Sequence, residues 1–345
     1  MIKDHAMKLD HASPTPAAAW MSRLPRQDVA LGVAMLLTIA ILPMLLNAYW
    51  LSVVMSSFVY ATAAIGTAVL YARLGLVSLA QVALVGVGGW CCMRIGFATG
   101  LPFELDMLAG ASITAVISMI IGLPALRMRG LYYALVTLMA ASAFFIIITA
   151  IAFPNGGPGF LGQDFANPQM FPRPWLGMSD AAMCRYNMVI TWLGFMLVEL
   201  HRRTAPGRAW AMIRRGDACA MASGVNIMLY KVWAFGLAGF LAGLAGGQMA
   251  GTFGHLDAST FLPSQSIMLF ALTVVGGAYI WFGQVLTGML FCMMPAVLNG
   301  IGVSGNLALV IFGAALLHTI VTAPNGIAGQ MAGLVAVLGG RRSKS

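Results

Sequence analysis

The sequence predicts an all-α polytopic membrane protein, and three observations support that fold class. Hydrophobic residues make up 60% of the 345 residues, charged residues make up only 8%, and the mean hydropathy is +0.88. A soluble domain carries about 25% charged residues, so this apolar excess cannot be hidden in a soluble core. The third observation is that the apolar residues come in runs of about 20, the length that crosses a hydrocarbon core about 30 Å thick.

The chain divides into polar tails and a long transmembrane domain. Residues 1–28 form a polar N-terminal tail, residues 29–339 the transmembrane domain, and residues 340–345 a basic C-terminal tail. The first apolar run lacks the small-residue pattern of a signal-peptide cleavage site, so we expect an uncleaved first span. We expect about ten spans, some of them broken or re-entrant. These are 29–47, 51–72, 75–97, 105–126, 131–153, 186–200, 231–253, 265–282, 284–303 and 305–323.

The basic residues predict the orientation of these spans. With the N-terminus in the cytoplasm, all but three of the 19 Lys and Arg residues fall on the cytoplasmic side, the exceptions being Arg94, Arg173 and Arg185. This asymmetry follows the positive-inside rule and accounts for the net charge of +9 without nucleic acid as a partner. It predicts that both termini are cytoplasmic, that the loop 154–185 is extracytoplasmic, and that the loop 202–230 is cytoplasmic.

Two glycine-interrupted segments predict broken backbone inside the membrane. They are Gly75–Trp90 and Val274–Gly288. Non-helical backbone at membrane depth persists only against protein or a water-filled cavity, so the pair indicates an inverted repeat with a substrate pathway between its halves. For each glycine, close packing between helices is the alternative. The expected pathway residues are Ser78, Gln81, Gly86, Gly88, Thr137, Gly276 and Gly277.

The interval Arg202–Lys231 is polar and lies between long apolar runs. Within it, we expect Gly207–Gly224 to form a short amphipathic piece whose small side chains share one helical face, with Gly216 as a break or cap. Such a face favours close packing against a partner, whereas the alternative is an ordinary arginine-rich loop. The residues that would share the face are Ala211, Arg215, Ala218 and Ala222.

Five sequence motifs occur in the order known from one family. The first two follow the patterns G-x-x-S-L-G-[HQ]-A and P-A-L-R-L-R-G-x-Y-x-A-[IL]-V-T-L. On these motifs the chain resembles the permease subunits of branched-chain amino-acid ABC importers, specifically the larger of the two related membrane subunits. Tyr279 and Ile280 depart from the family pattern, because small residues are usual there. The matching segments are Gly75–Val82, Pro124–Leu138, Asn155–Gly159, Gly207–Gly224 and Ala323–Ile327.

The resemblance implies a permease subunit of the bacterial inner membrane, not an enzyme, that forms the pathway for branched-chain or related small amino acids. Urea or another short amide is the alternative substrate. It implies a second homologous permease, two ABC ATPases, an extracytoplasmic substrate-binding protein and membrane lipid as partners. It also implies ATPase-coupling residues in the cytoplasmic loop, namely Gly207, Arg208, Ala211, Asp217, Ala218, Ala220, Ala222 and Gly224.

We expect no cofactor or metal on this chain itself. A P-loop needs Gly-Lys-[Ser/Thr], and no lysine of the chain follows a glycine, so ATP and Mg²⁺ are expected on the partner ATPases. The five cysteines have neither a paired framework nor metal-ligand spacing.

An ion-coupled secondary transporter or channel is the alternative from another class. Such proteins usually place carboxylates or histidines at membrane depth. Here Glu199 is expected at a cytoplasmic end, Asp106 on the extracytoplasmic side, and His318 well inside a span. A membrane enzyme is a weaker alternative, since the histidines are scattered and no H-E-x-x-H spacing occurs.

Overall fold

The computed structural model describes residues 37–125, 128, 131–151, 169–302, 307, 310–311, 313–314 and 326–331. The predicted tails 1–28 and 340–345, residues 29–36 of the first predicted span, loop residues 152–168 and most of the predicted span 305–323 lie outside these residues. Residues 37–45 are helical and belong to a compact unit that ends at Leu45. The description below concerns the second unit, which begins at Leu46.

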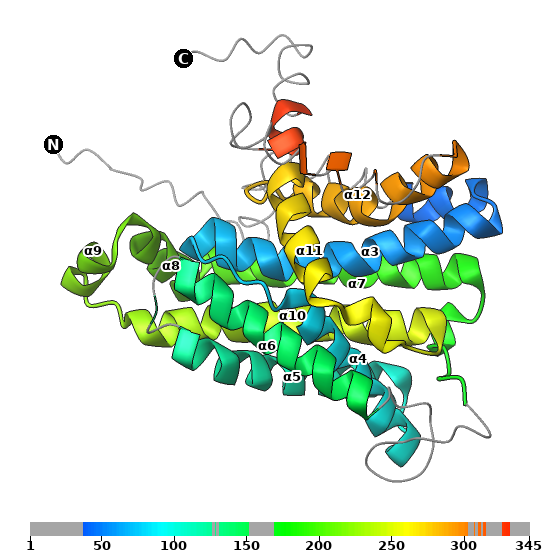
Figure 1. Ribbon diagram of the computed structural model, residues 1–345, viewed down its shortest axis with the longest axis horizontal. Coiled ribbons are helices and arrows are strands. Elements are labelled where there is room, and N and C mark those ends of the chain that lie inside the picture. The colour runs from blue at the N-terminus through cyan, green and yellow to red at the C-terminus, as the bar shows by residue number, and fades with distance from the viewer. Residues whose placement is uncertain are drawn as a thin grey trace, which may run out of the picture. The chain divides into compact units, whose positions relative to one another are not determined.

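The prediction of an all-α polytopic membrane protein is confirmed. In the described residues, seven helices are long and apolar enough to cross a membrane, and they lie side by side in a bundle (Figure 1). The elements are α3 (Ala48–Ala68) continued by the π-helix η1 (Val69–Leu74), α4 (Gln81–Thr99), α5 (Phe103–Ala125), α6 (Leu131–Ala150), the 3₁₀ turn η2 (Trp175–Gly177), α7 (Asp180–Arg203), α8 (Ala205–Arg215), α9 (Asp217–Ala222), α10 (Ile227–Phe253), the 3₁₀ turn η3 (Ala258–Phe261), α11 (Pro263–Gly276) and α12 (Trp281–Gly300).

Local sequence sets where these helices begin and end. Asn47, Ser179 and Asn226 precede α3, α7 and α10, and each side chain accepts a hydrogen bond from the backbone N–H three residues later. These bonds satisfy donors that have no partner within the helix. Gly75 and Gly254 end η1 and α10 with φ of 74° and 68°, a conformation that favours glycine.

Three predicted spans need correction. The short span predicted at 186–200 is the full-length helix α7 of 24 residues. The span predicted at 75–97 becomes helical only at Gln81, after six non-helical residues. The span predicted at 265–282 is α11, whose 14 residues extend about 21 Å, which is too short to cross a membrane. The predicted total of ten spans is therefore not reproduced in the described residues.

Helix α10 lies at the centre of the bundle. It packs against α3, α4 and α5, and its residues from Ala234 to Thr252 are almost all buried. Glycines make these contacts possible, because a Cβ on Gly243 would overlap the backbone of α5 and one on Gly246 would overlap the backbone of α4. Small residues at such crossings let helix backbones approach closely, which is how helices associate in a membrane.

The described helices repeat in an inverted order. Helix α3 runs towards the end of the bundle that carries α8 and α9, called here the α8 end, and after the break at 75–80 helix α4 runs back from the middle. Helix α10 runs away from the α8 end, and after the break at 254–262 the short helix α11 runs back towards it (Figure 1). The first helix of each half packs on later helices of the other half: α10 packs on α4 and α5, and α3 packs on α11 and α12.

The inverted repeat corrects one predicted correspondence. We expected Val274–Gly288 to be the counterpart of Gly75–Trp90, but the counterpart is the break at 254–262 followed by α11. Segment Val274–Gly288 instead contains the turn between α11 and α12, which matches the turn between α4 and α5 at Gly100. Segments Gly75–Trp90 and Val274–Gly288 are both rich in glycine, but the first contains the break before α4 and the second contains a turn between two helices.

The ends of α7 test the predicted orientation. Ser179 and Thr204 flank α7, whose 24 residues extend about 36 Å, and both are exposed. Single cysteines at these positions, in a cysteine-free background, should react with a membrane-impermeant thiol reagent from opposite sides of sealed vesicles, with Ser179 on the extracytoplasmic side. Labelling of both from the same side would refute the assignment of α7 as a crossing helix.

Candidate functional site

Helices α4 and α11 both begin in the middle of the bundle, where their first turns meet. The Nε2 of Gln81, the first residue of α4, donates to Ala63 O of α3 and to Ala238 O of α10, each at 3.1 Å. Ala63 and Ala238 lie about 16 Å along their helices from the α8 end. The first turn of α11 is at the same level, because Ser266 Oγ accepts a bond of 3.1 Å from Val82 N.

Side chains from other helices complete the hydrogen bonding of this junction. The first N–H groups of a helix have no intrahelical acceptor, and leaving one buried without a partner is costly. Ser266 supplies the acceptor for Val82, and Thr137 Oγ1 on α6 accepts a bond of 3.0 Å from Leu79 N in the break. The predicted pathway residue Thr137 is completely buried. Its observed contact is with the backbone of the break.

Two further predicted pathway residues, Ser78 and Gln81, lie in or beside the break at 75–80. Both are buried, and the amide nitrogen of Gln81 is fully used in joining α3 to α10. The Gln81 Oε1 atom accepts no hydrogen bond from the described residues. The structure thus brings Ser78, Gln81 and Thr137 together, and their contact with a substrate stays a prediction.

The predicted pathway glycines of α4 lie at close contacts between helices. A Cβ on Gly88 would overlap the backbone of Gly243 on α10. A Cβ on Gly86 would come within 2.6 Å of the Phe144 ring of α6 and 3.0 Å of the Phe261 ring of η3. These contacts agree with close helix packing, the alternative weighed from the sequence, and a pathway role for either glycine remains untested.

Gly276 and Gly277 lie near the α8 end, in the turn between α11 and α12, and not opposite Ser78 and Gln81. Gly277 has φ of 113°, and its carbonyl oxygen accepts a bond of 3.3 Å from Gln284 Nε2. A Cβ on Gly276 would come within 2.6 Å of Gly283 O. The two glycines therefore permit a tight reversal of the chain. The element that faces the start of α4 is the first turn of α11, which the sequence did not indicate.

The predicted coupling segment forms two helices, α8 and α9, instead of one amphipathic piece. Gly216 has φ of 147° and separates them, and Gly224, with φ of 73°, follows α9. Ala211 and Arg215 thus lie on α8, while Ala218 and Ala222 lie on α9. The prediction that these four residues share one continuous helical face was therefore wrong. Ala211, Ala218 and Ala222 are nevertheless all exposed, and they remain available to a partner.

Other predicted coupling residues shape this element or face solvent. A Cβ on Gly207 would overlap the carbonyl of Arg202, so glycine permits the tight passage from α7 to α8. Asp217 Oδ1 at the start of α9 pairs with Lys231 Nζ of α10 at 3.3 Å. Arg208 is exposed, and Ala220 is completely buried.

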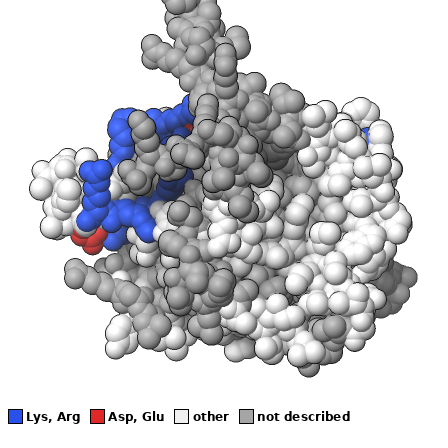
Figure 2. Space-filling view, turned by 90° about the horizontal axis from the view of Figure 1, so that it is seen from above, with Lys and Arg blue, Asp and Glu red and all other residues white. Residues whose placement is uncertain are grey.

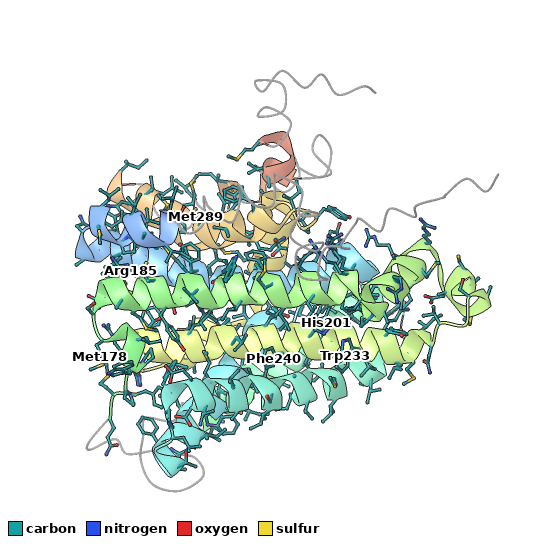
Figure 3. All side chains as sticks on the ribbon, turned by 180° about the vertical axis from the view of Figure 1, so that it is seen from behind. Met178, Arg185, His201, Trp233, Phe240 and Met289 are labelled. Carbon is teal, nitrogen blue, oxygen red and sulfur yellow. The ribbon has the colours of Figure 1, made fainter. Side chains whose placement is uncertain are left out.

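Trp210, which the sequence reading did not single out, anchors α8 to the bundle. Its indole is 1% exposed, and Nε1 donates to Tyr230 O on α10 at 2.9 Å. His201 of α7 stacks on the Trp210 ring at 6.3 Å and lies 6.0 Å from the Trp233 ring. Figure 3 shows His201 and Trp233 where α7 and α10 run side by side. Helix α8 therefore cannot shift without disturbing both neighbouring helices.

Basic side chains gather at the α8 end. Figure 2 shows Lys and Arg concentrated there, beside a few acidic groups. Glu199 is one of these, with Oε2 at 2.6 Å from Arg202 Nε and Oε1 at 2.5 Å from Arg203 Nε. Because these pairs are substantially exposed, they contribute little to stability. Glu199 offsets only part of the basic charge, so this end keeps a positive surface.

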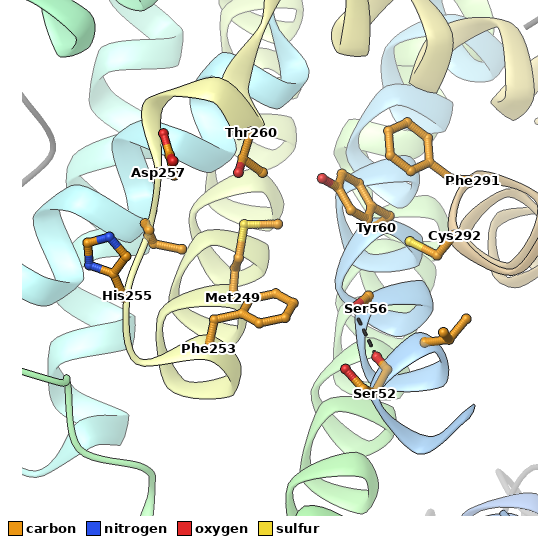
Figure 4. A pocket seen from close by; sticks show the side chains of 12 residues that line it. Ser52, Ser56, Tyr60, Met249, Phe253, His255, Asp257, Thr260, Phe291 and Cys292 are labelled. Carbon is orange, nitrogen blue, oxygen red and sulfur yellow. Dashed lines mark hydrogen bonds between the residues drawn. The ribbon is translucent and has the colours of Figure 1, made fainter. Parts of the chain in front are cut away.

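A pocket of about 510 Å³ opens between α3, α12 and the segment from the end of α10 to η3 (Figure 4). Its walls combine hydroxyl groups of Ser52, Ser56 and Tyr60 with the apolar rings of Phe253 and Phe291. The Tyr60 and Phe291 rings are stacked at 4.1 Å. No sequence pattern indicated this pocket, because its residues come from three separate parts of the chain.

Asp106 is a buried carboxylate at the start of α5. This residue lies in the first turn of α5 and is only 2% exposed, a burial that the sequence did not indicate. A carboxylate is favourable near a helix N-terminus, and its Oδ2 packs against Gly96 of α4. Among the described residues, no group of three His, Cys, Asp or Glu side chains is placed to hold a metal ion.

Comparisons with known proteins agree with the motifs. A family model described as the permease component of branched-chain amino acid transport systems matches residues 49–320. The chain is 22% identical over 279 residues to the high-affinity branched-chain amino acid transport system permease protein LivM of Escherichia coli K12, and 23% identical over 255 residues to LivM of Salmonella typhimurium LT2. The matches cover 75% and 68% of this chain but only 65% and 60% of those relatives. No solved structure matches.

The packing of Gly88 gives a stability prediction. Gly88→Ala should lower the free energy of unfolding by about 1 to 3 kcal/mol, the usual cost of overpacking a tight contact. Gly300→Ala is the matched control, because nothing lies within 4 Å of a Cβ at that position of α12. Thermal unfolding in detergent should separate the two variants, and an equal change in both would show that the crossing of α4 and α10 is loosely packed.

Proposed function

Because the chain belongs to the family of branched-chain amino acid transport permease components, we propose that it is the transmembrane permease subunit of an ABC importer. The observation that carries this proposal is the placement of α8 and α9. They form a compact, exposed element at one end of the bundle, anchored through Trp210 and beside η1, which leads into the break at 75–80, and the turn between α11 and α12. Such an element is suited to receive a soluble ATPase.

We propose that the substrate is a branched-chain or related small amino acid, with urea or another short amide as the alternative. The pocket between α3 and α12 supports an entry point at the end opposite α8. Its volume of about 510 Å³ suits a small molecule. Its hydroxyls beside apolar rings suit a ligand with one polar and one aliphatic part. Transport then passes towards the junction of α4 and α11, where the backbone is broken.

The proposed assembly contains two ABC ATPases, a second homologous permease and an extracytoplasmic substrate-binding protein, embedded in the lipid of a bacterial inner membrane. ATP and Mg²⁺ belong to the ATPases, so this chain is not itself an enzyme. The α8 end and both termini face the cytoplasm in this proposal. The positive surface at that end supports the orientation through the positive-inside rule.

The energy source tests the proposal. In vesicles that contain the chain and its partners, uptake of radiolabelled leucine should require ATP inside and survive collapse of the proton gradient. Radiolabelled urea in parallel distinguishes the two substrate classes. Asp106→Asn should keep ATP-driven uptake within about twofold, since the reaction uses no proton carrier in the span. Uptake by this chain alone, driven by a pH step, would instead identify a secondary transporter.

The exposed alanines of α9 test the docking surface. Ala218→Glu should abolish co-purification of the ATPase and substrate-stimulated ATP hydrolysis, because a charge buried in an interface without a partner is costly. Met178→Glu is the control, since Met178 is 70% exposed and precedes α7 at the opposite end. Membrane insertion should be normal in both variants. If the ATPase co-purifies normally with the Ala218→Glu variant, the α8–α9 segment is instead an arginine-rich loop that only fixes the orientation of the spans.

A further inference from the structure

Arg214, near the end of α8, bonds to both halves of the inverted repeat. Its Nη1 donates to Tyr71 O at 2.6 Å, and its Nη2 donates to Tyr279 Oη at 2.9 Å. The guanidinium carbon lies 5.6 Å from the centre of the Tyr279 ring, within the range of a cation–π contact. One side chain of α8 thus holds η1 and the turn between α11 and α12.

Both contact points lie beside a discontinuity in the backbone. Tyr71 belongs to the π-helix η1, and its carbonyl also accepts a bond of 2.9 Å from Gly75 N, where the break before α4 begins. π-helical turns are uncommon and often occur at functional sites. A Cβ on Gly75 would lie 3.2 Å from Arg214 Nη1, so the guanidinium rests directly on the break.

The second contact point is the reversal that follows Gly277. Ala278 in this turn packs against Ala68 and Ala72 of the α3–η1 helix. The Tyr71 ring makes an edge contact with Phe270 of α11 at 5.4 Å and lies 6.2 Å from the Tyr279 ring. The ends of α3 and α11 therefore form one aromatic cluster, to which Arg214 is attached.

The chemistry of the contact favours arginine and tyrosine specifically. A guanidinium presents several N–H donors in a rigid fork, so it can bond two acceptors that lie in different directions and also face a ring. Tyr279 supplies the second acceptor at a position where the family pattern has a small residue. This departure from the pattern creates a contact that a small side chain would not make.

We propose that Arg214 is a positioning residue that transmits movement of α8 to both halves of the repeat, with Tyr279 as its partner. The inference rests on the proposed function, in which an ATPase moves α8. Trp210 holds the middle of α8 on α10, whereas Arg214 extends from its last turn to the cluster of Tyr71, Phe270 and Tyr279. Movement of that turn pulls on both contact points together, so the break at 75–80 and the reversal after Gly277 change in concert.

The test compares Arg214→Gln, Tyr279→Phe and the double variant in vesicles with the complete transporter. The measurement is the amount of leucine taken up per ATP hydrolysed. Arg214→Gln should lower this ratio about tenfold, the effect of losing a hydrogen bond to a charged group, while ATPase co-purification and ATP hydrolysis persist. Tyr279→Phe should lower it less, and the double variant should match Arg214→Gln, because the two residues act through one contact.

Controls and contrary outcomes separate the inference from the proposed function. Arg173→Gln and Tyr132→Phe remove the same groups elsewhere, from a half-buried arginine paired with Asp180 and from an exposed tyrosine, and should keep the wild-type ratio. An unchanged ratio in Arg214→Gln, additive losses in the double variant, or parallel losses of uptake and ATP hydrolysis would overturn the inference. Wild-type uptake that does not need ATP would overturn the proposed function instead. If Arg214→Gln fails to reach the membrane, the amount of leucine taken up per ATP hydrolysed is measured in Tyr279→Phe and Arg214→Lys instead, and the same criteria apply.

Discussion

Every backbone N–H and C=O group inside a membrane must find its partner within the protein, and this constraint governs the centre of the fold. Two helices begin there, so their first N–H groups need acceptors from elsewhere. Ser266 accepts a bond from Val82 in the first turn of α4, Thr137 accepts one from Leu79 in the break before it, and Gln81 ties the same junction to α3 and α10. Each of these bonds joins different helices, so the hydrogen bonding of the breaks also fixes the positions of α6 and α11.

Close packing by glycine is the second requirement, and it follows from the first. A side-chain bond of about 3 Å across the junction forms only if the helix backbones are close together. Gly88, Gly243 and Gly246 permit that approach between α4 and α10. Near α8, aromatic contacts join the helices, as in the cluster around Tyr71. The fold thus combines a rigid centre with an end where helices meet through rings and one arginine.

The sequence predicted what depends on composition and on local pattern. Hydropathy gave the membrane class and most helices, and glycine content indicated the break at 75–80. Hydropathy overestimated the length of α11, because a window of apolar residues does not report where in the membrane a helix begins. The bond between Val82 and Ser266 joins residues separated by 184 positions, and such a pair leaves no periodic signal. Helical spacing alone placed Ala211, Arg215, Ala218 and Ala222 on one face, but Gly216 ends α8 between them. The burial of Asp106 depends on tertiary packing, which no local pattern reports.

The exchanged contacts of the inverted repeat also constrain how the protein is made. Helix α3 leaves the ribosome early, yet its neighbours α11 and α12 are among the last elements of the described chain. Helix α5 likewise packs on α10, which is synthesised later. Neither half can complete its own packing, and contacts so distant in sequence form slowly. During synthesis, the surface of α3, rich in alanine, serine and threonine, therefore remains in contact with lipid or with the insertion machinery until the second half arrives, and only then does the bundle close.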